Sequence, residues 1–228
     1  MELSLKEDDE RLGRREAVLG CYNLSEENKE AQSMIWQPVS REFFNQPTLE
    51  LAQALIGMLL VKETPEGAAA GWIVETEAYR GPDDRAAHSF GGRRTKRTEV
   101  MFGEPGHAYA HVMHTHCLLN VVSAEPGSPE GVLIRAVEPC EGLELMIERR
   151  GADKKRRDLT SGPGKLTKAL GITMADYGHP MYARPLYIAA GRKPGVISTG
   201  PRIGIDNSGE ARGYPWRFWE SGNPFVSR

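Results

Sequence analysis

The stretch IVETEAYRGPDDRAAHS, residues 73–89, links a strand-like segment to a Gly-Pro turn and a histidine. Apolar and polar residues alternate from Ile73 to Tyr79, as they do in a half-buried β-strand. Glu75, Glu77 and Tyr79 are therefore predicted to share one face, with neighbouring members about 6.5 Å apart along the strand. Two carboxylates and an aromatic ring at one strand end need a structural or a chemical reason.

The residues before this strand predict a helix and a β-hairpin. Thr48 can cap a helix that begins near Leu49 and ends at Gly57. The segment MLLVKE, residues 58–63, has the pattern of a strand, and the TPEG turn joins it to the strand that carries the two glutamates.

The residues after it predict further strands and two helices. Residues 106–124 form a long strand or a hairpin, and residues 131–139 form another strand. Pro139 is expected to open a helix, and Ser161 is expected to cap another that stops at Gly171. Strand patterns also fill the C-terminal third, at 184–191, 195–205 and 216–222.

This order of elements predicts one α+β domain over residues 37–228, with a curved, largely antiparallel β-sheet, flanking helices and a protruding β-hairpin. Residues 1–36 are polar and lack apolar periodicity, so they are expected to form a mobile arm. The N-terminus has no apolar core after its charges, which argues against a secretory signal. No apolar run approaches the roughly 18 residues that a membrane span needs.

Composition indicates a cytosolic globular protein. The chain has 228 residues, 39% hydrophobic and 26% charged, and its three cysteines form no C-x-x-C pair, as expected for reduced thiols. Residues 1–32 carry nine acids and five bases, so the remaining residues hold a balance of +2 within a total of −2. Two basic clusters, at 93–97 and 149–157, are expected to be solvated loops when judged by charge alone.

Two motifs suggest sites that the sequence does not complete. SGPGK resembles a phosphate-binding loop, but Leu159 and Leu166 occupy positions that require Gly and Ser or Thr. A helix N-terminus with Lys165 in its first turn can still hold one phosphate. Histidines at 107, 111, 114 and 116 beside Cys117 suggest a metal site, yet strand alternation divides them between two faces. A metal-dependent hydrolase remains an alternative, although no metal or cofactor is expected.

The two glutamates allow a comparison with sugar hydrolases, in which paired carboxylates flank a glycosidic bond. Carboxylates two apart on one strand rarely reach opposite faces of a sugar. We therefore expect Glu75 to be structural, bonded to a neighbouring arginine or a backbone amide.

Six blocks of the sequence carry a family resemblance: residues 73–97, MFGEPGHAY, GVLIRAVEP, EGLELM, SGPGKLTKALGI and RIGID followed by NPFVS. In this order they resemble the alkyladenine DNA glycosylase family, the mammalian type of 3-methyladenine DNA glycosylase. The resemblance extends over nearly all of residues 42–228. It implies a DNA repair enzyme that hydrolyses the N-glycosidic bond of alkylated or deaminated purines in duplex DNA, with 3-methyladenine, 7-methylguanine, hypoxanthine and ethenoadenine as the lesion class.

The resemblance also implies roles for individual residues. Glu77 is the general base that activates water, and Arg135, together with the backbone carbonyl of Ile203, helps to hold that water and the phosphate. Tyr79 and His88 contact the flipped base, and Asn120 excludes the amino group of normal guanine. The base pocket further includes His111 and Leu133. The positions that match DNA contacts are Arg93, Thr95, Arg97, Met101, Met113, His114, Ser161 and Lys165.

The hairpin departs from the family pattern. Where the family has a tyrosine that stacks on the base and another that wedges into the minor groove, this sequence offers His111 for stacking and either His114 or Met113 for the wedge. Weaker flipping, an altered lesion range or a pH dependence near the histidine pKa are the resulting hypotheses.

The expected protein is a monomer that needs no cofactor, acts on double-stranded DNA and does not cleave the strand, because no lysine is placed as a nucleophile. It is expected in the cytoplasm with the nucleoid if bacterial, or in the nucleus if eukaryotic. The alternative from another class is a catalytically weak DNA-damage-binding protein on the same fold. Glu77 together with Arg135 favours the enzyme.

Overall fold

A computed structural model describes residues 36–227, within which the folded domain begins at Pro38. The predicted arm over residues 1–36 lies outside the described residues except for Trp36. Within the described part of the chain, helices are all too short or too polar to span a bilayer.

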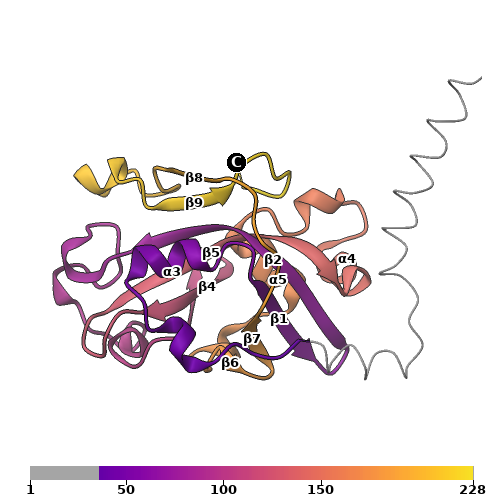
Figure 1. The fold of residues 1–228 in the computed structure, drawn as a ribbon, viewed down its shortest axis with the longest axis horizontal. Coiled ribbons are helices and arrows are strands. Elements are labelled where there is room, and N and C mark those ends of the chain that lie inside the picture. The colour runs from indigo at the N-terminus through magenta and orange to yellow at the C-terminus, as the bar shows by residue number, and fades with distance from the viewer. Residues whose placement is uncertain (1–35, 228) are drawn as a thin grey trace, which may run out of the picture. The chain divides into compact units, whose positions relative to one another are not determined.

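The domain is an α+β fold built on a curled antiparallel sheet, as predicted (Figure 1). Its strands are β1 (Leu59–Thr64), β2 (Gly67–Tyr79), β3 (Ala108–Met113), β4 (His116–Ser123), β5 (Glu130–Glu141), β6 (Tyr182–Ala183), β7 (Leu186–Ala189), β8 (Ile197–Gly200) and β9 (Arg217–Glu220). Its α-helices are α3 (Thr48–Ala54), α4 (Leu143–Arg150) and α5 (Pro163–Leu170).

Strand β2 is the centre of this sheet, whose main path runs β3-β4-β5-β2-β1-β7-β6. The first half of β2 pairs with β1 across the predicted hairpin, and its other edge pairs with β5. Past the residues that pair with β1, the C-terminal end of β2 pairs along the same edge with β9, which in turn pairs with β8. Glu77 therefore lies between β5 and β9, opposite Leu133 and Arg217, where both edges of β2 are covered.

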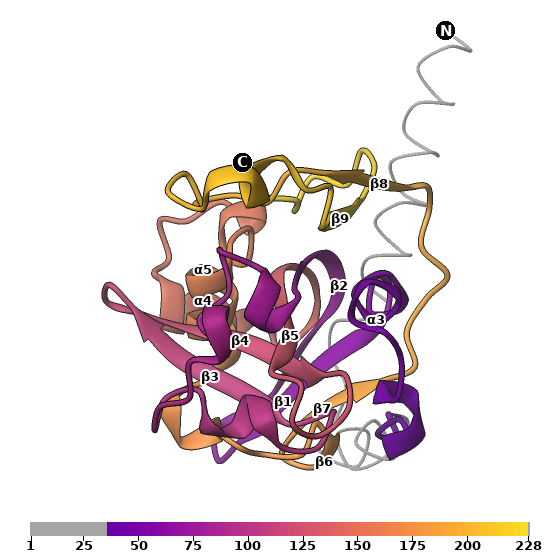
Figure 2. The same ribbon diagram turned by 90° about the vertical axis from the view of Figure 1, so that its left-hand side faces the viewer.

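Strands β3 and β4 form the predicted β-hairpin, which extends to the left in Figure 2. Met113 pairs with His116, so His114 and Thr115 make a two-residue turn. His114 has φ 53°, which fits the positive φ that such tight turns require. The hairpin places exposed side chains at its tip, while β4 continues into the core through its pairing with β5.

One hydrophobic core joins the helices to the sheet. Leu51 and Leu55 around the end of α3, Met146 of α4, and Leu166 of α5 are all buried in it. They pack with strand residues such as Leu60, Ile73, Leu119, Ile134 and Ile188. The opposite side of β2 is therefore free to carry the polar side chains at 75 and 77.

Three helix-boundary predictions were wrong. Thr48 is the first residue of α3 and caps nothing, because its hydroxyl bonds to Ser123 and Glu130. Pro139 does not open a helix but lies within β5, beside a register shift in its pairing with β2, where a missing N–H is tolerated. Helix α4 begins after Gly142.

Ser161 is the third error. Its backbone forms a bridge with Ala136, and Gly162 is the residue that precedes α5, with no side-chain cap. Pro163 occupies the first turn of α5, where its missing N–H costs nothing. The predicted stop at Gly171 is confirmed, since the backbone of that glycine adopts the left-handed conformation, with φ 79°.

Candidate active site

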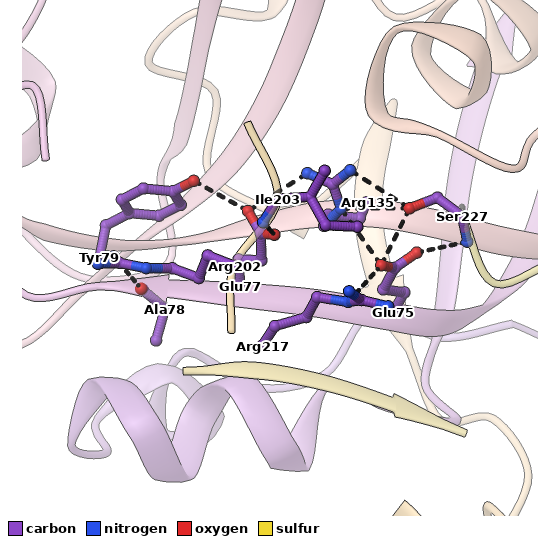
Figure 3. Close-up of polar contacts among 9 residues, drawn as sticks. All are labelled: Glu75, Glu77, Ala78, Tyr79, Arg135, Arg202, Ile203, Arg217 and Ser227. Carbon is purple, nitrogen blue, oxygen red and sulfur yellow. Dashed lines mark hydrogen bonds and ion pairs between the residues drawn. The ribbon is translucent and has the colours of Figure 1, made fainter. Parts of the chain in front are cut away.

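The carboxylate of Glu77 is completely buried at the end of β2 (Figure 3). Its Oε1 accepts a hydrogen bond of 2.7 Å from the backbone N–H of Ile203. Its Oε2 accepts one of 2.9 Å from the Tyr79 hydroxyl and lies 3.3 Å from Nη1 of Arg135. Two hydrogen-bond donors and one guanidinium, from three different segments, therefore converge on this one carboxylate.

The environment of Glu77 makes it a stronger base than an ordinary glutamate. Burial raises the pKa of this carboxyl above its usual value of 4.5, and the nearby Glu75 adds to the effect. Arg135, the Ile203 amide and the Tyr79 hydroxyl act in the opposite direction, because each favours the ionised form. The outcome is a carboxylate poised to accept a proton, as a general base must.

Glu75, two residues earlier, is also fully buried but is saturated with donors. The backbone N–H and the hydroxyl of Ser227 donate to it at 2.7 and 3.0 Å. Nε of Arg217 lies 2.9 Å from its Oε1, and Nε of Arg135 lies 3.3 Å from the same oxygen. The expected bonding of Glu75 to an arginine and a backbone amide is confirmed, and its structural role stays a prediction.

A cavity of about 440 Å³ lies beside Glu77. Its wall includes the three groups that contact Glu77, namely Tyr79, Arg135 and Ile203. All five residues predicted for a base pocket line it: Tyr79, His88, His111, Asn120 and Leu133. Met101 and Met113, predicted as DNA contacts, line it as well. The sequence positions that looked scattered along the chain are thus gathered around one hollow.

Two imidazoles in this wall are neutral at neutral pH. Burial lowers the pKa of His88 to about 4, and the pKa of His111 to about 3. The positive charge of Arg97 contributes to both shifts. Burial of His88 and His111 therefore argues against a pH dependence of these two rings near the ordinary histidine pKa, and that hypothesis stays a prediction to be measured.

The tautomer of His111 follows from its contact with Asn120. Nδ2 of Asn120 donates to the carbonyl of Tyr109 at 3.2 Å, which fixes the orientation of the amide, and lies 3.3 Å from Nδ1 of His111. Nδ1 therefore accepts and the proton resides on Nε2. Nε2 is buried without a protein partner.

The predicted phosphate-contacting residues lie outside the cavity wall. Arg93, Arg97 and Lys165 are exposed, whereas Thr95 and Ser161 are half-buried. At the hairpin tip, Met113 is 43% exposed and also lines the cavity, whereas His114 is exposed in the turn and does not line it.

Sequence patterns missed several residues of the site. Tyr109 stacks on His111 with ring centroids 4.8 Å apart, and its hydroxyl lies 2.8 Å from Nδ1 of His88. Its position two residues before His111 on one strand was a usable signal. Residues 204–208 also line the cavity, and so does Pro163. The RIGID block covers residues 202–206, but of these only Ile203 was given a role from the sequence.

The histidines near the hairpin do not make a metal site. Among residues 36–227, no three side chains of His, Cys, Asp or Glu gather in a way that could hold a metal ion. His107 instead lies 3.0 Å from the carbonyl of Glu104 through Nδ1, and His116 is exposed. The metal-dependent hydrolase thus lacks a ligand set in the described part of the chain.

Comparison with known proteins identifies relatives over almost the whole domain. The sequence profile of the methylpurine-DNA glycosylase family matches residues 42–224. A protein of Bacillus licheniformis named "Putative 3-methyladenine DNA glycosylase" is 66% identical over 192 residues, covering 84% of this chain and 97% of that protein. Proteins of the same name are 64% identical in Bacillus subtilis, over 84% of this chain and 97% of theirs, and 46% identical in Listeria monocytogenes, over 83% and 92%.

Proposed function

The chain belongs to the methylpurine-DNA glycosylase family and is a DNA repair enzyme that hydrolyses N-glycosyl bonds, and on that premise we propose how it acts. It excises alkylated or deaminated purines, of the 3-methyladenine, 7-methylguanine, hypoxanthine and ethenoadenine class, from duplex DNA. The damaged nucleotide flips into the cavity beside Glu77, and Glu77 activates the water that attacks its anomeric carbon. The enzyme acts as a monomer and leaves the DNA strand intact.

One observation carries this proposal: a fully buried glutamate, held by two hydrogen-bond donors and an arginine ion pair, adjoins an aromatic-lined cavity of about 440 Å³. A base inside the DNA stack cannot bring its glycosidic bond to a buried carboxylate, so the nucleotide must leave the stack. A cavity lined by Tyr79, Tyr109 and His111 offers flat ring surfaces to an extruded purine.

The chemistry needs a base and a negative charge at the same place. In its ionised form Glu77 takes a proton from water, and its charge stabilises the positive charge that develops on the sugar. Glu75 and Glu77 hold Arg135 in place in the cavity wall. We propose that its remaining N–H groups orient the water or a phosphate of the DNA. The N–H of Ile203 already serves Glu77, which leaves its carbonyl as the group that would hold the water.

Asn120 and His111, which line the cavity, are proposed to select the base. Nδ2 of Asn120 is hydrogen-bonded to the carbonyl of Tyr109 and to Nδ1 of His111. We propose that Asn120 excludes the amino group of normal guanine. His111 takes the place of a stacking tyrosine and presents a smaller ring. The lesion range should therefore differ from that of family members with tyrosine.

Contacts outside the cavity position the duplex. Arg93, Arg97 and Lys165 are exposed and carry positive charge, which suits phosphate contacts without sequence preference. Thr95 and Ser161 are assigned to the same surface by the family resemblance. Met113, exposed at the hairpin tip and lining the cavity, can fill the gap that the flipped base leaves.

The test uses an end-labelled duplex with one hypoxanthine, incubated with the wild type in the presence of a chelator and then treated with hot alkali. We expect strand breaks at the lesion only after alkali. Glu77→Gln should lose them, and Glu144→Gln, the same change at an exposed position of α4, should keep them. Ethenoadenine and 3-methyladenine substrates are assayed in parallel.

Other outcomes contradict specific parts of the proposal. Breaks without alkali would exclude a monofunctional enzyme, and activity that disappears with the chelator would exclude a metal-free mechanism. Tight binding to every lesion duplex without any excision would instead support the catalytically weak damage-binding protein.

A further inference from the structure

Arg202 is a fully buried cation next to the site, and none of the family roles above involves it. Its two terminal nitrogens donate to the two carboxylate oxygens of Asp84, at 2.5 and 2.8 Å. Asp84 is itself completely buried. Such a two-pronged arginine–carboxylate pair fixes orientation as well as charge, which a single contact does not.

This pair ties together three segments that line the cavity. Nη1 of Arg202 also donates to the carbonyl of Ala78 at 2.8 Å, and Ala78 is the residue between Glu77 and Tyr79. Asp84 accepts the backbone N–H groups of Arg80 and Ala86, at 3.1 and 3.0 Å. The end of β2, the loop that leads to His88 and the segment around residue 203 are thereby held by one ion pair.

Arg202 is linked to both hydrogen-bond donors of Glu77, to Tyr79 through space and to Ile203 as its neighbour in the chain. Its guanidinium carbon lies 4.6 Å from the ring centroid of Tyr79, whose hydroxyl donates to Glu77. The next residue along the chain, Ile203, donates its backbone N–H to the other oxygen of Glu77. Figure 3 shows Arg202 between Tyr79 and Ile203 with its guanidinium directed at Ala78.

We propose that Arg202 is a positioning residue of the glycosylase, which holds the Tyr79 hydroxyl and the Ile203 amide on Glu77 and so keeps the general base ionised. This inference rests on the proposed role of Glu77. Arg202 touches neither substrate nor water in this scheme, and it acts only through the donors that it fixes.

Burying an ion pair is costly, and an apolar replacement of equal volume often stabilises a protein as well or better. What the pair supplies here is geometry that an apolar group cannot supply: two bonds to Asp84 and one to the carbonyl of Ala78. Lysine cannot supply it either, because one ammonium group cannot bond to both oxygens of Asp84, donate to the carbonyl of Ala78 and also lie over the ring of Tyr79.

The experiment measures the titration of Glu77 directly. Protein labelled with ¹³C at the glutamate carboxyl carbons is titrated by NMR, and the Glu77 signal is assigned by its absence in Glu77→Gln. Because the Ile203 amide and the Tyr79 hydroxyl both lower the pKa of Glu77, loosening them should raise its midpoint. We expect Arg202→Lys to move that midpoint upward by about one pH unit.

Two further variants sharpen the result. Asp84→Asn keeps the volume of the buried partner and removes its charge, so it should shift the midpoint in the same direction, and it carries the test if Arg202→Lys does not fold. Arg192→Lys is the control, because Arg192 forms ion pairs with Glu138 and Glu220 away from the cavity wall. It should leave the midpoint unchanged.

Excision of the lesion is followed over the same pH range, and its acid limb should move together with the NMR midpoint. An unchanged Glu77 midpoint in folded Arg202→Lys and Asp84→Asn overturns the inference, whatever happens to activity. A wild type that excises nothing contradicts the proposed function instead, and the NMR comparison still decides whether Arg202 positions the donors.

Discussion

Nη1 of Arg135 lies 3.3 Å from a carboxylate oxygen of Glu77, and the same guanidinium reaches Glu75 through Nε, also at 3.3 Å. One arginine thus serves two buried glutamates that differ in every other partner. Glu75 has Ser227 and Arg217 in addition, whereas Glu77 has the donors of the cavity wall. The same side-chain type at a spacing of two therefore has two different roles.

The first prediction separates these roles by stability. Glu75→Gln replaces a charge that two buried or half-buried arginines share, so it should lower the free energy of unfolding by about 3–5 kcal/mol. Glu77→Gln should be at least as stable as the wild type at neutral pH. The pKa of the Glu77 carboxyl is raised in the folded wild type, so stability is lost as the pH rises from the ordinary value of 4.5 through the raised folded pKa, and the amide removes this cost.

Urea denaturation at pH 7 and at pH 4 measures both variants. Because the raised pKa lets the folded wild type take up a proton at Glu77 before the unfolded chain does, the advantage of Glu77→Gln should shrink toward pH 4. Equal destabilisation by the two substitutions would contradict the division of roles.

A second prediction concerns the two imidazoles of the cavity. His88 and His111 should stay neutral down to about pH 5, because burial lowers their pKa values to about 4 and about 3. ¹⁵N NMR of labelled histidine reports this directly. Since the unfolded chain binds these protons first, stability should also fall as the pH drops below about 6.5. Titration of either ring near 6.5 would show that the cavity is open to water.

The sequence predicted the strands better than the helix boundaries. Alternation along Ile73–Tyr79 and the hairpin at 106–124 were sufficient for the sheet, because burial on one face imposes a period of two. The caps expected at Thr48 and Ser161 failed because tertiary partners took those groups: Ser123 and Glu130 for the Thr48 hydroxyl, and Ala136 for the Ser161 backbone.

The site shows the same division. Glu77, Tyr79 and His88 belong to one short stretch, so their proximity could be predicted from it. Arg202 could not, because its partner Asp84 is 118 residues away and nothing in RIGID marks an ion pair. The neutrality of His111 likewise depends on burial that only the folded chain creates.

A third prediction resolves the wedge at the hairpin tip. Met113→Ala should reduce excision from duplex DNA by about tenfold. The substitution removes the apolar side chain that fills the gap left in the base stack by the flipped nucleotide. His114→Ala should have a smaller effect, since His114 does not line the cavity. Val112→Ala is the matched control, being 48% exposed on the same strand but absent from the cavity wall. A single-stranded substrate should be insensitive to Met113, because it has no stack to fill. The opposite ranking of Met113 and His114 would assign the wedge to His114.

A fourth prediction tests the phosphate contacts through salt. Arg93→Ala and Lys165→Ala should each weaken binding to damaged and undamaged duplexes alike. Each should also reduce the slope of log K against log salt concentration by about 0.9, the value for one lost phosphate contact. Lys193→Ala, an exposed lysine on the β7–β8 connection, should leave the slope unchanged. A loss confined to damaged DNA would place Arg93 or Lys165 in lesion recognition instead.

The last prediction concerns the acid limb of the reaction. Glu77 must be ionised to accept a proton from water, and burial raises its pKa above 4.5. Excision should therefore decline as the pH falls through that raised pKa, with a midpoint above 4.5 and a limiting slope of one. A 7-methylguanine substrate isolates this step, because its base already carries a positive charge and needs no proton to leave. Single-turnover rates from pH 4 to pH 8 measure the limb, and residual excision by Glu77→Gln should lack it. A limb that persists in Glu77→Gln would assign it to another group, and a midpoint below 4.5 would mean that the donors on Glu77 outweigh its burial.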